Sequence, residues 1–268
     1  MTAARAPLAG LTVLVPRARD QAGGFSALLR ERGAEPLEVP TIEIRPVAAT
    51  ADLDRAVADL AARRFDWVVL TSVNGVAALR ARVEALGHAP DVVAAAAKVA
   101  AVGPATEAAL RDWGVTPDLV PEVATTAALG HAFPDRPGDH PGGSGRVLLA
   151  RADLANPELA VILRDKGWEP AEVVAYHTVP VGALDPAARR RLDGGEVDWV
   201  AFTASSTVEG FLRGYGGPPP PGVRVAAIGP VTADTARSAG IPVATTATDH
   251  TIGGLVAAIE HAVAGGVG

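Results

Sequence analysis

The sequence predicts an α/β protein made of two similar lobes, each a parallel sheet flanked by helices. Short apolar runs alternate with helical patterns along the chain, which is typical of parallel sheets covered on both faces. Sequence blocks also recur in a fixed order, at separations near half of the 268 residues. A chain of that length has room for two domains of ordinary size.

The recurring blocks indicate an internal duplication. The segment GAEPLEVPTIEIRPV at Gly33–Val47 returns 134 residues later as GWEPAEVVAYHTVPV at Gly167–Val181, with 7 of 15 positions identical. The segment FDWVVLTSVNGV at Phe65–Val76 returns as VDWVAFTASSTV at Val197–Val208. Long matches of this kind are the signature of repeated structural units.

Two shorter matches keep the same order. Lys98–Thr106 (KVAAVGPAT) shares 6 of 9 residues with Arg224–Thr232 (RVAAIGPVT), and VLVPR, starting at Val13, aligns with VLLAR, starting at Val147. Shared α/β patterns and a biased composition could explain one such match. Four matches in one order instead indicate that a single ancestral unit was duplicated.

The elements follow in order from local patterns. The apolar run Leu11–Val15 predicts a buried strand. A helix follows it, with Asp20 as the expected N-cap and Gly33 as the residue that ends it. The runs Trp67–Leu70 and Trp199–Phe202 predict two further buried strands, each followed by a Thr/Ser-rich turn and a helix.

Two more strands are expected at Val99–Val102 and Val225–Ile228. Each runs into a Gly-Pro pair and then an alanine-rich helix. Proline suits the first turn of a helix, because the N–H that it lacks would have no helical partner there. These strands are therefore expected to lead directly into helix N-termini.

Equivalent tryptophans and aspartates mark the start of one strand in each repeat. We expect Trp67 and Trp199 to pack in the core rather than stack on a ligand. Asp66 and Asp198 precede them, and we interpret both as turn residues rather than as an acid–base pair. Neither pair is therefore a candidate for catalysis.

Two extended segments leave the domain boundaries open. Pro36–Val47 and Pro170–Val181 are rich in β-branched residues and are longer than a typical strand. Each could be a strand plus a loop within its own lobe, or both could be connections that run between lobes. In the first case the boundary would fall in the Pro- and Gly-rich stretch Pro134–Gly145. In the second case the lobes would not be sequential halves.

Turns between strands and helices are the places where α/β folds bind ligands. Backbone N–H groups at a helix N-terminus suit a carboxylate or phosphate, although Ser, Thr and Asn in such turns commonly only cap the helix. Four turns in equivalent positions predict a shared anion-binding cleft. Its candidate residues are Thr71, Ser72, Asn74, Gly103, Pro104, Thr106, Thr203, Ser205, Ser206, Gly229, Val231 and Thr232.

Three further residues are candidates. Arg17 and Arg151 follow equivalent strands and could form bidentate pairs with carboxylates, or could be solvated loop arginines. Tyr176 has Ile42 as its counterpart in the repeat, so the duplication does not explain it. Its phenol could be structural, or it could donate a hydrogen bond or a proton to a ligand.

Composition and missing motifs exclude several classes of protein. Without cysteine, disulfides, cysteine nucleophiles and thiolate metal sites are ruled out. A net charge of −6 argues against nucleic acid as a partner. The six histidines show no metal-ligand spacing, and phosphate-loop, dinucleotide and GxSxG motifs are absent. With no signal peptide or membrane-spanning run, we expect a cytoplasmic protein without membrane contact.

Together these blocks resemble the uroporphyrinogen-III synthase family over nearly the whole chain. The resemblance is carried by VLVPRARDQAGGFSALLRERGAEPLEVPTIEIRP, FDWVVLTSVNGV, KVAAVGPAT, GWEPAEVVAYHTVP, VDWVAFTASSTVEGF and RVAAIGPVTADTARSAGI. Each block alone is moderately specific, whereas their order together with the duplication is quite specific.

The resemblance implies a crossed arrangement of two α/β lobes joined by a two-stranded linker. One lobe would combine residues 1–38 with 178–268, and the other would span 46–171. Residues 39–45 and 172–177 would form the linker strands.

The resemblance also implies the chemistry. The substrate would be hydroxymethylbilane, a linear tetrapyrrole with eight carboxylates, and the products uroporphyrinogen III, with ring D inverted, and water. No metal or organic cofactor would be needed. Tyr176 would assist departure of the hydroxyl, and Thr232 would bind substrate. We expect a monomer with no nucleic-acid partner.

Two other hypotheses about function compete with that of a synthase. One is a non-catalytic two-lobed binding or sensor protein for an anionic small molecule, and the other is a nucleotide- or flavin-binding α/β protein. The missing phosphate-loop motifs count against the second of these.

Overall fold

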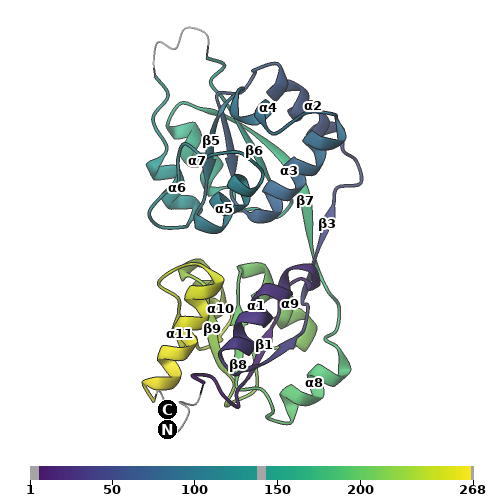
Figure 1. The fold of residues 1–268 in the computed structure, drawn as a ribbon, viewed down its shortest axis with the longest axis vertical. Coiled ribbons are helices and arrows are strands. Elements are labelled where there is room, and N and C mark those ends of the chain that lie inside the picture. The colour runs from purple at the N-terminus through teal and green to yellow at the C-terminus, as the bar shows by residue number, and fades with distance from the viewer. Residues whose placement is uncertain (1–5, 138–142, 267–268) are drawn as a thin grey trace. The chain divides into compact units, whose positions relative to one another are not determined.

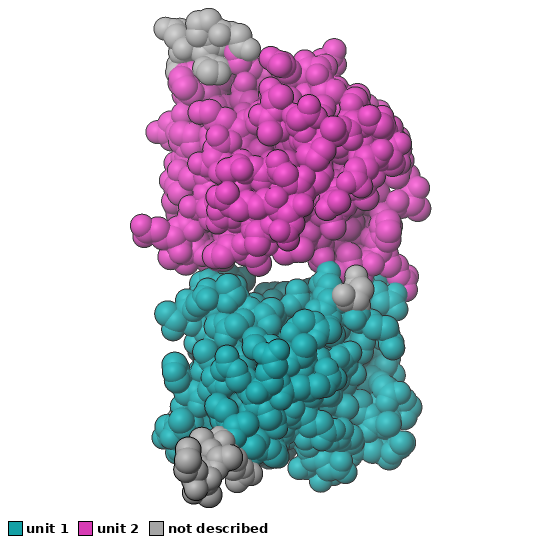
Figure 2. All heavy atoms as spheres, viewed as in Figure 1, with its two compact units in different colours: residues 1–43, 179–268 teal, residues 44–178 magenta. Residues whose placement is uncertain are grey.

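The computed structural model describes residues 6–137 and 143–266. The chain divides into two compact units, which we call unit 1 (residues 1–43 and 179–268) and unit 2 (residues 44–178) (Figure 2). Unit 1 thus combines both ends of the chain, whereas unit 2 is one continuous stretch. The division does not fall in Pro134–Gly145, the alternative boundary that composition suggested.

Unit 1 is a five-stranded sheet in the order β10-β9-β8-β1-β2, and its strand pairs are parallel (Figure 1). One core packs α1 and α11 against the sheet, and a second core packs α8, α9 and α10 against it. The elements are β1 (Thr12–Val15), α1 (Arg19–Glu31), β2 (Glu35–Glu38), α8 (Pro186–Asp193), β8 (Trp199–Phe202), α9 (Ser205–Tyr215), β9 (Arg224–Ala227), α10 (Pro230–Ser238), β10 (Thr245–Thr246) and α11 (Ile252–Ala264).

The second five-stranded sheet, in the order β3-β7-β6-β4-β5, belongs to unit 2, and β7, β6, β4 and β5 are parallel to one another. Its strands β3 and β7 run across the two points at which the chain passes between the units, so Ile42, in β3, belongs to unit 1. Helices α2 to α5 share one core with this sheet, and α6 and α7 share another. The elements are β3 (Ile42–Pro46), α2 (Ala51–Ala61), β4 (Trp67–Leu70), α3 (Val73–Ala85), α4 (Asp91–Ala94), β5 (Lys98–Ala101), α5 (Pro104–Asp112), α6 (Thr126–Ala132), β6 (Arg146–Ala152), α7 (Glu158–Asp165) and β7 (Glu169–Pro180).

The strand register reproduces the sequence repeat. Val13 pairs with Pro36 in unit 1, and Val147 pairs with Pro170 in unit 2, at the same offset of 134 residues. Likewise β8 pairs with β9 as β4 pairs with β5, so that four strands of each sheet match one for one. The predicted fold class, two similar α/β units with parallel sheets flanked by helices, is confirmed.

The tryptophans at the start of β4 and β8 lie in the two cores, as expected. Trp67 is 6% exposed and Trp199 is 1% exposed. A cation lies 5.5 Å from the ring centroid in each case, Lys98 over Trp67 and Arg224 over Trp199. Because burial and a matching surface cation account for both rings, neither is needed for ligand stacking.

The aspartates before these strands hold neighbouring backbone in place. A carboxylate oxygen of Asp66 accepts a hydrogen bond from the Gly145 N–H at 2.5 Å. In unit 1 the Asp198 carboxylate accepts one from the Thr12 N–H at 2.7 Å. Each aspartate thus ties the start of one strand to its neighbour, and the predicted structural role is confirmed.

One local expectation needs correction. Asp20 is not the N-cap of the first helix: α1 begins one residue earlier, at Arg19, so that Ala18 is the N-cap and Asp20 lies within the first turn. The predicted end of that helix holds, since Gly33 follows it with φ +86°, a conformation that favours glycine.

The two extended segments also differ from each other. The first is divided into β2 and β3, which belong to different sheets, whereas the second forms the single 12-residue strand β7. Residues 172–176, which the resemblance assigns to a connection, are paired with β6 as far as Tyr176. Pairing with β6 gives the N–H and carbonyl groups of residues 172–176 hydrogen-bond partners, which an unpaired linker would lack.

Candidate functional site

In each unit the candidate turns lie at the carboxyl edge of the sheet. In unit 2, β4 leads into the turn at Thr71–Asn74 and β5 into Gly103-Pro104. In unit 1, β8 leads into Thr203–Ser206 and β9 into Gly229-Pro230. Because these neighbouring strands are parallel, each unit brings two helix N-termini to one edge, where such folds bind ligands.

The strongest cluster in unit 2 joins Tyr176 to Ser72. Their hydroxyl oxygens are 2.9 Å apart, and Ser72 is also the N-cap of α3, accepting a hydrogen bond from the Gly75 N–H at 3.0 Å. Gly75 permits close packing, since a Cβ there would stand 2.9 Å from the carbonyl oxygen of Ala150. The phenol therefore rests on a helix N-terminus that is fixed against β6.

Burial raises the pKa of Tyr176 above its usual value. Tyr176 as a whole residue is 7% exposed. Hydrogen bonds with Ser72 and Asn74 oppose the upward shift of its pKa without cancelling it, and the charge of Asp153 adds to the shift. The phenol accordingly stays protonated across the neutral range. In this state it can donate a hydrogen bond or a proton.

The equivalent turn of unit 1 has different chemistry. Its N-cap is Ala204, whose N–H and carbonyl both bond the hydroxyl of Thr207. Ser205 lies next to it and shares a hydrogen bond of 2.7 Å with Thr235. Thr203 and Ser206 are half-buried, as are Thr71 and Asn74 in unit 2. This turn of unit 1 thus supplies hydroxyls, whereas a phenol lies at the equivalent turn of unit 2.

The two Gly-Pro turns share one backbone and differ in what covers them. A Cβ on Gly103 would stand 2.5 Å from the Cβ of Ala124, whereas a Cβ on Gly229 would stand 3.2 Å from the imidazole of His250. Gly103 and Gly229 both have an extended backbone, which any residue can adopt. Glycine is favoured there because a side chain would lack room, not because of the φ angle.

Of the other residues in these two turns, some are accessible and some are not. Thr106 and Thr232 are 3% and 5% exposed, whereas Val231 is 57% exposed and Pro104 is exposed. A ligand at the Gly229 turn would therefore meet Val231 and the helix N-terminus before it met the side chain of Thr232.

The arginines do not behave alike. Arg151 lies within β6, is buried, and is ion-paired with Glu172. It also donates a hydrogen bond of 2.8 Å to the carbonyl of Asn156. Its guanidinium is thus committed to holding protein groups. Arg17 is half-buried and follows β1 by two residues.

Three residues that surround these turns were missed by the sequence reasoning. Asp153 and His177 form a pair next to Tyr176, with Oδ2 and Nδ1 2.8 Å apart, and His250 covers Gly229. Histidine spacing in the sequence bears only on metal binding, so it gave no sign of these contacts. The repeat offered a signal, because His250 corresponds to Ala124 and Asp153 to Arg19.

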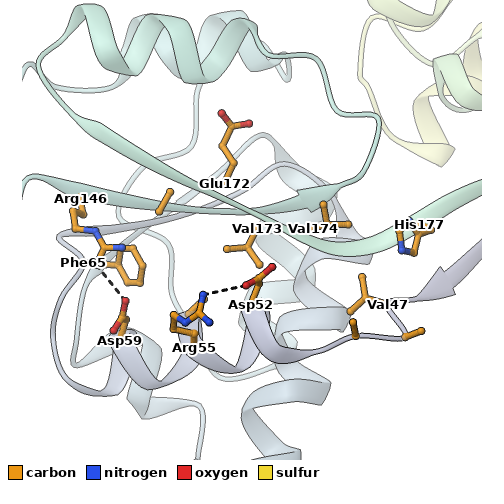
Figure 3. Close-up of a pocket in the computed structure, with 14 residues that line it drawn as sticks. Val47, Asp52, Arg55, Asp59, Phe65, Arg146, Glu172, Val173, Val174 and His177 are labelled. Atoms are coloured by element: carbon orange, nitrogen blue, oxygen red, sulfur yellow. Dashed lines mark hydrogen bonds and ion pairs between the residues drawn. The ribbon is translucent and has the colours of Figure 1, made fainter.

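Unit 2 also has a groove of about 600 Å³ between α2 and β7 (Figure 3). Its charges are paired within the protein, Arg146 with Asp59 at 3.3 Å and Arg55 with Asp52 at 3.1 Å. Since it offers no surplus of positive charge, the groove is poorly suited to a polycarboxylate.

Among residues 6–137 and 143–266, no cluster of His, Asp or Glu could hold a metal ion. Over the same residues, no helix combines the length and apolar character required to cross a bilayer.

Comparison with known proteins identifies relatives over most of the chain. The family model described as uroporphyrinogen-III synthase HemD matches residues 24–257. The uroporphyrinogen-III synthase of Synechococcus elongatus is 32% identical over 266 residues, covering 96% of this chain and 97% of that protein. The porphyrin biosynthesis protein HemD of Ruminiclostridium josui is 30% identical, and the match covers 86% of this chain but 44% of that longer protein.

Solved structures show the same fold. A mutant uroporphyrinogen III synthase from Thermus thermophilus matches with a TM-score of 0.66 at 24% identity, covering 95% of this chain and 99% of that one. The uroporphyrinogen-III synthetase of Helicobacter pylori matches with a TM-score of 0.55 at 16% identity, covering 92% and 97%. At these identities the likeness concerns the fold alone.

Proposed function

The chain belongs to the uroporphyrinogen-III synthase family, and we propose that Tyr176 and the turns at the two sheet edges carry its activity. An enzyme of this family is a lyase of tetrapyrrole biosynthesis. The relative from Synechococcus elongatus supports this activity and not the alternative of a non-catalytic binding protein. The observation that carries the proposal is the buried phenol of Tyr176, held by Ser72 at the carboxyl edge of unit 2.

The substrate, hydroxymethylbilane, sets the task for the protein. The resemblance implies that this linear tetrapyrrole loses its hydroxyl and closes unaided, but to the wrong isomer. The enzyme must therefore direct attack to the substituted carbon of ring D, so that a spiro intermediate forms and the ring is inverted. Catalysis of this kind depends chiefly on positioning.

Backbone N–H groups at the turns would hold the acetate and propionate arms. Helix N-termini attract carboxylates through unpaired N–H groups and the helix dipole, and unit 1 and unit 2 each offer two of them. Because the protein carries a net charge of −6, this local attraction acts against an unfavourable overall field. We therefore expect binding to weaken as salt is added.

Tyr176 would assist departure of the substrate's hydroxyl as water. Its raised pKa keeps the proton on the phenol oxygen, where it is available to the leaving group. Such a phenol is a weak acid, so its contribution depends on its place next to the leaving hydroxyl.

Because each turn and Tyr176 belong to one chain, we further propose a monomer. We place it in the cytoplasm, where a substrate that closes unaided would be made and used.

The product isomer tests this function. Hydroxymethylbilane is generated in situ, the protein is added, and the products are oxidised and separated into uroporphyrin isomers, with heat-denatured protein as the control. We expect the type III isomer to dominate. Type I product at the ratio found with denatured protein would rule the function out.

A further inference from the structure

The strand that carries Tyr176 contains a β-bulge. The pairing of β7 with β6 is regular as far as Arg151 and Val174, and the next pair joins Ala152 with Tyr176. Ala175 is therefore an extra residue, with no partner of its own on β6. Bulges of this kind change the direction of the side chains that follow them.

The bulge determines which face of the sheet receives the phenol. In a regular strand, residues two positions apart share a face, so Tyr176 would lie on the side of Glu172 and Val174. Those two residues are exposed, whereas Ala175 and Tyr176 are both buried in the core beneath α2 to α5. The extra residue thus turns the phenol to the face where Ser72 opens α3.

Asp153 binds the three residues that follow the bulge. Its N–H donates to the carbonyl of Tyr176 at 3.3 Å, and its carboxylate lies 2.8 Å from Nδ1 of His177. The carboxylate also accepts from the N–H groups of Thr178, at 3.3 Å, and Leu154, at 3.1 Å. One residue therefore fixes the path of β7 directly after the bulge.

The charge of Asp153 is maintained by the same contacts. Partial burial acts to raise the pKa of Asp153, but the hydrogen bonds with His177, Thr178 and Leu154 outweigh it, and the pKa lies below its usual value. The carboxylate is accordingly ionised at neutral pH, and its charge helps burial to keep Tyr176 protonated.

In unit 1, the described residues at the equivalent positions do not form this clamp. Arg19, the exposed first residue of α1, stands at the position of Asp153, and Ile42 stands at the position of Tyr176. The strand β2 ends at Glu38, before the matching stretch begins. The clamp therefore occurs in the repeat that has a phenol to hold.

We propose that Asp153 is a positioning residue: by clamping β7 after its bulge, it holds the phenol of Tyr176 against Ser72. Its importance for the reaction rests on the proposed function of Tyr176. The tests below separate the position of the phenol from its use.

The position of the phenol can be measured without substrate. Tyr176 and Tyr215 are the two tyrosines of the chain, so in a Tyr215→Phe background tyrosinate absorbance reports Tyr176 alone. We expect Asp153→Asn to lower the pH midpoint of this titration, because the phenol loses a nearby negative charge and part of its burial. Asp52→Asn, which removes an exposed ion pair with Arg55, is the matched control. An unchanged midpoint in Asp153→Asn would overturn the proposal.

Kinetics then test the consequence. We expect Asp153→Asn to lower kcat about tenfold with little change in KM, at or below the low end of general-acid effects. The same substitution should cause no further loss in a Tyr176→Phe background, and an equal loss there would contradict the proposal. If Tyr176→Phe alone keeps the full rate while Asp153→Asn still shifts the titration, the proposed function of Tyr176 fails and the positioning role stands.

His177→Ala provides a second variant if Asp153→Asn does not fold. It removes one contact of the clamp and leaves the carboxylate of Asp153 in place. We expect the titration midpoint and kcat to fall by less than in Asp153→Asn, but in the same direction. Wild-type values for both would contradict the clamp.

Discussion

The two repeats share a strand–turn–helix arrangement and differ in the residues at the positions of Tyr176 and Ser72. Unit 2 places Tyr176 against Ser72, whereas the sequence repeat puts Ile42 and Ala204 at these positions in unit 1. The N-cap of the unit 1 helix is instead supported by the hydroxyl of Thr207. The duplication thus kept the strand–turn–helix frame in both units and a phenol–hydroxyl pair in one.

A second difference concerns the Gly-Pro turns. Ala124 packs on Gly103 in unit 2, and the ring of His250 packs on Gly229 in unit 1. An alanine methyl group in a packed turn has nowhere to move, whereas a half-buried imidazole can rotate. Equivalent turns are therefore expected to tolerate substitution differently.

The largest expected effect is that of Tyr176→Phe on the rate of type III product formation. We predict a loss of roughly tenfold to a hundredfold, since a positioned acid contributes at least this much in many enzymes. Tyr215→Phe, which removes the other phenol and its 2.7 Å bond to Asp193, is the control and should keep the wild-type rate. An unchanged rate in Tyr176→Phe would make Tyr176 structural.

Alanine at the two turn glycines should separate the units by stability. Gly103→Ala is expected to lower the free energy of unfolding by about 1–3 kcal/mol, the usual cost of overpacking. Gly229→Ala should cost less, because His250 can give way. Urea unfolding of both variants measures the difference. Equal costs would show that Ala124 yields as easily as His250.

Substitution of the N-cap residue should lower the free energy of unfolding in unit 2, where Ser72 caps α3, and not in unit 1, where Ala204 is the N-cap of α9. Ser72→Ala is expected to lower the free energy of unfolding by about 1 kcal/mol, typical for an N-cap. Ala204→Ser is the matching variant in unit 1. We expect it to change the free energy of unfolding little, because the hydroxyl of Thr207 already bonds the N–H and the carbonyl of Ala204. A large gain from Ala204→Ser would mean that this cap is incomplete.

The smallest effect concerns alkaline pH. Tyr176 has a raised pKa, so the folded state binds this proton more tightly than the unfolded state does. The corresponding stability is fully present below about pH 10 and is lost as the pH rises through the folded pKa. The urea midpoint of unfolding is measured against pH for Tyr215→Phe and for the double variant Tyr215→Phe/Tyr176→Phe. We expect the midpoint of the double variant to fall less as the pH rises above about 10, because it has no Tyr176 proton to lose. Parallel curves would contradict the raised pKa.

Much of the fold followed from sequence because strands and repeats leave local signals. Trp67–Leu70 and Trp199–Phe202 were predicted at their observed limits, and the offsets between repeats reappear in the strand register. Gly33 likewise marked the end of α1 through a conformation that favours glycine. Such features depend on neighbouring residues, which a sequence shows directly.

The site was less accessible, because its partners are distant in sequence. Tyr176 was a candidate because the residue at its position in the other repeat is Ile42. No local sequence pattern predicted its contact with Ser72, which lies 104 residues away. For Arg151 the sequence left a ligand contact and a solvated loop position open, whereas in the structure it is ion-paired with Glu172, because tertiary packing decides where a guanidinium within a strand points. The bulge at Ala175 leaves no mark in composition, so the sequence marked Asp153 only through Arg19, its unlike counterpart in the repeat.

A double-mutant cycle on Tyr176 and Ser72 tests most directly whether this pair is the functional difference between the repeats. The values of kcat/KM for type III product formation are measured for Tyr176→Phe, Ser72→Ala and the double variant. We predict that both single variants lose activity and that the double variant is no slower than the slower single one, because the two hydroxyls act as one unit. Losses that multiply, or single variants with the wild-type value, would contradict this interpretation.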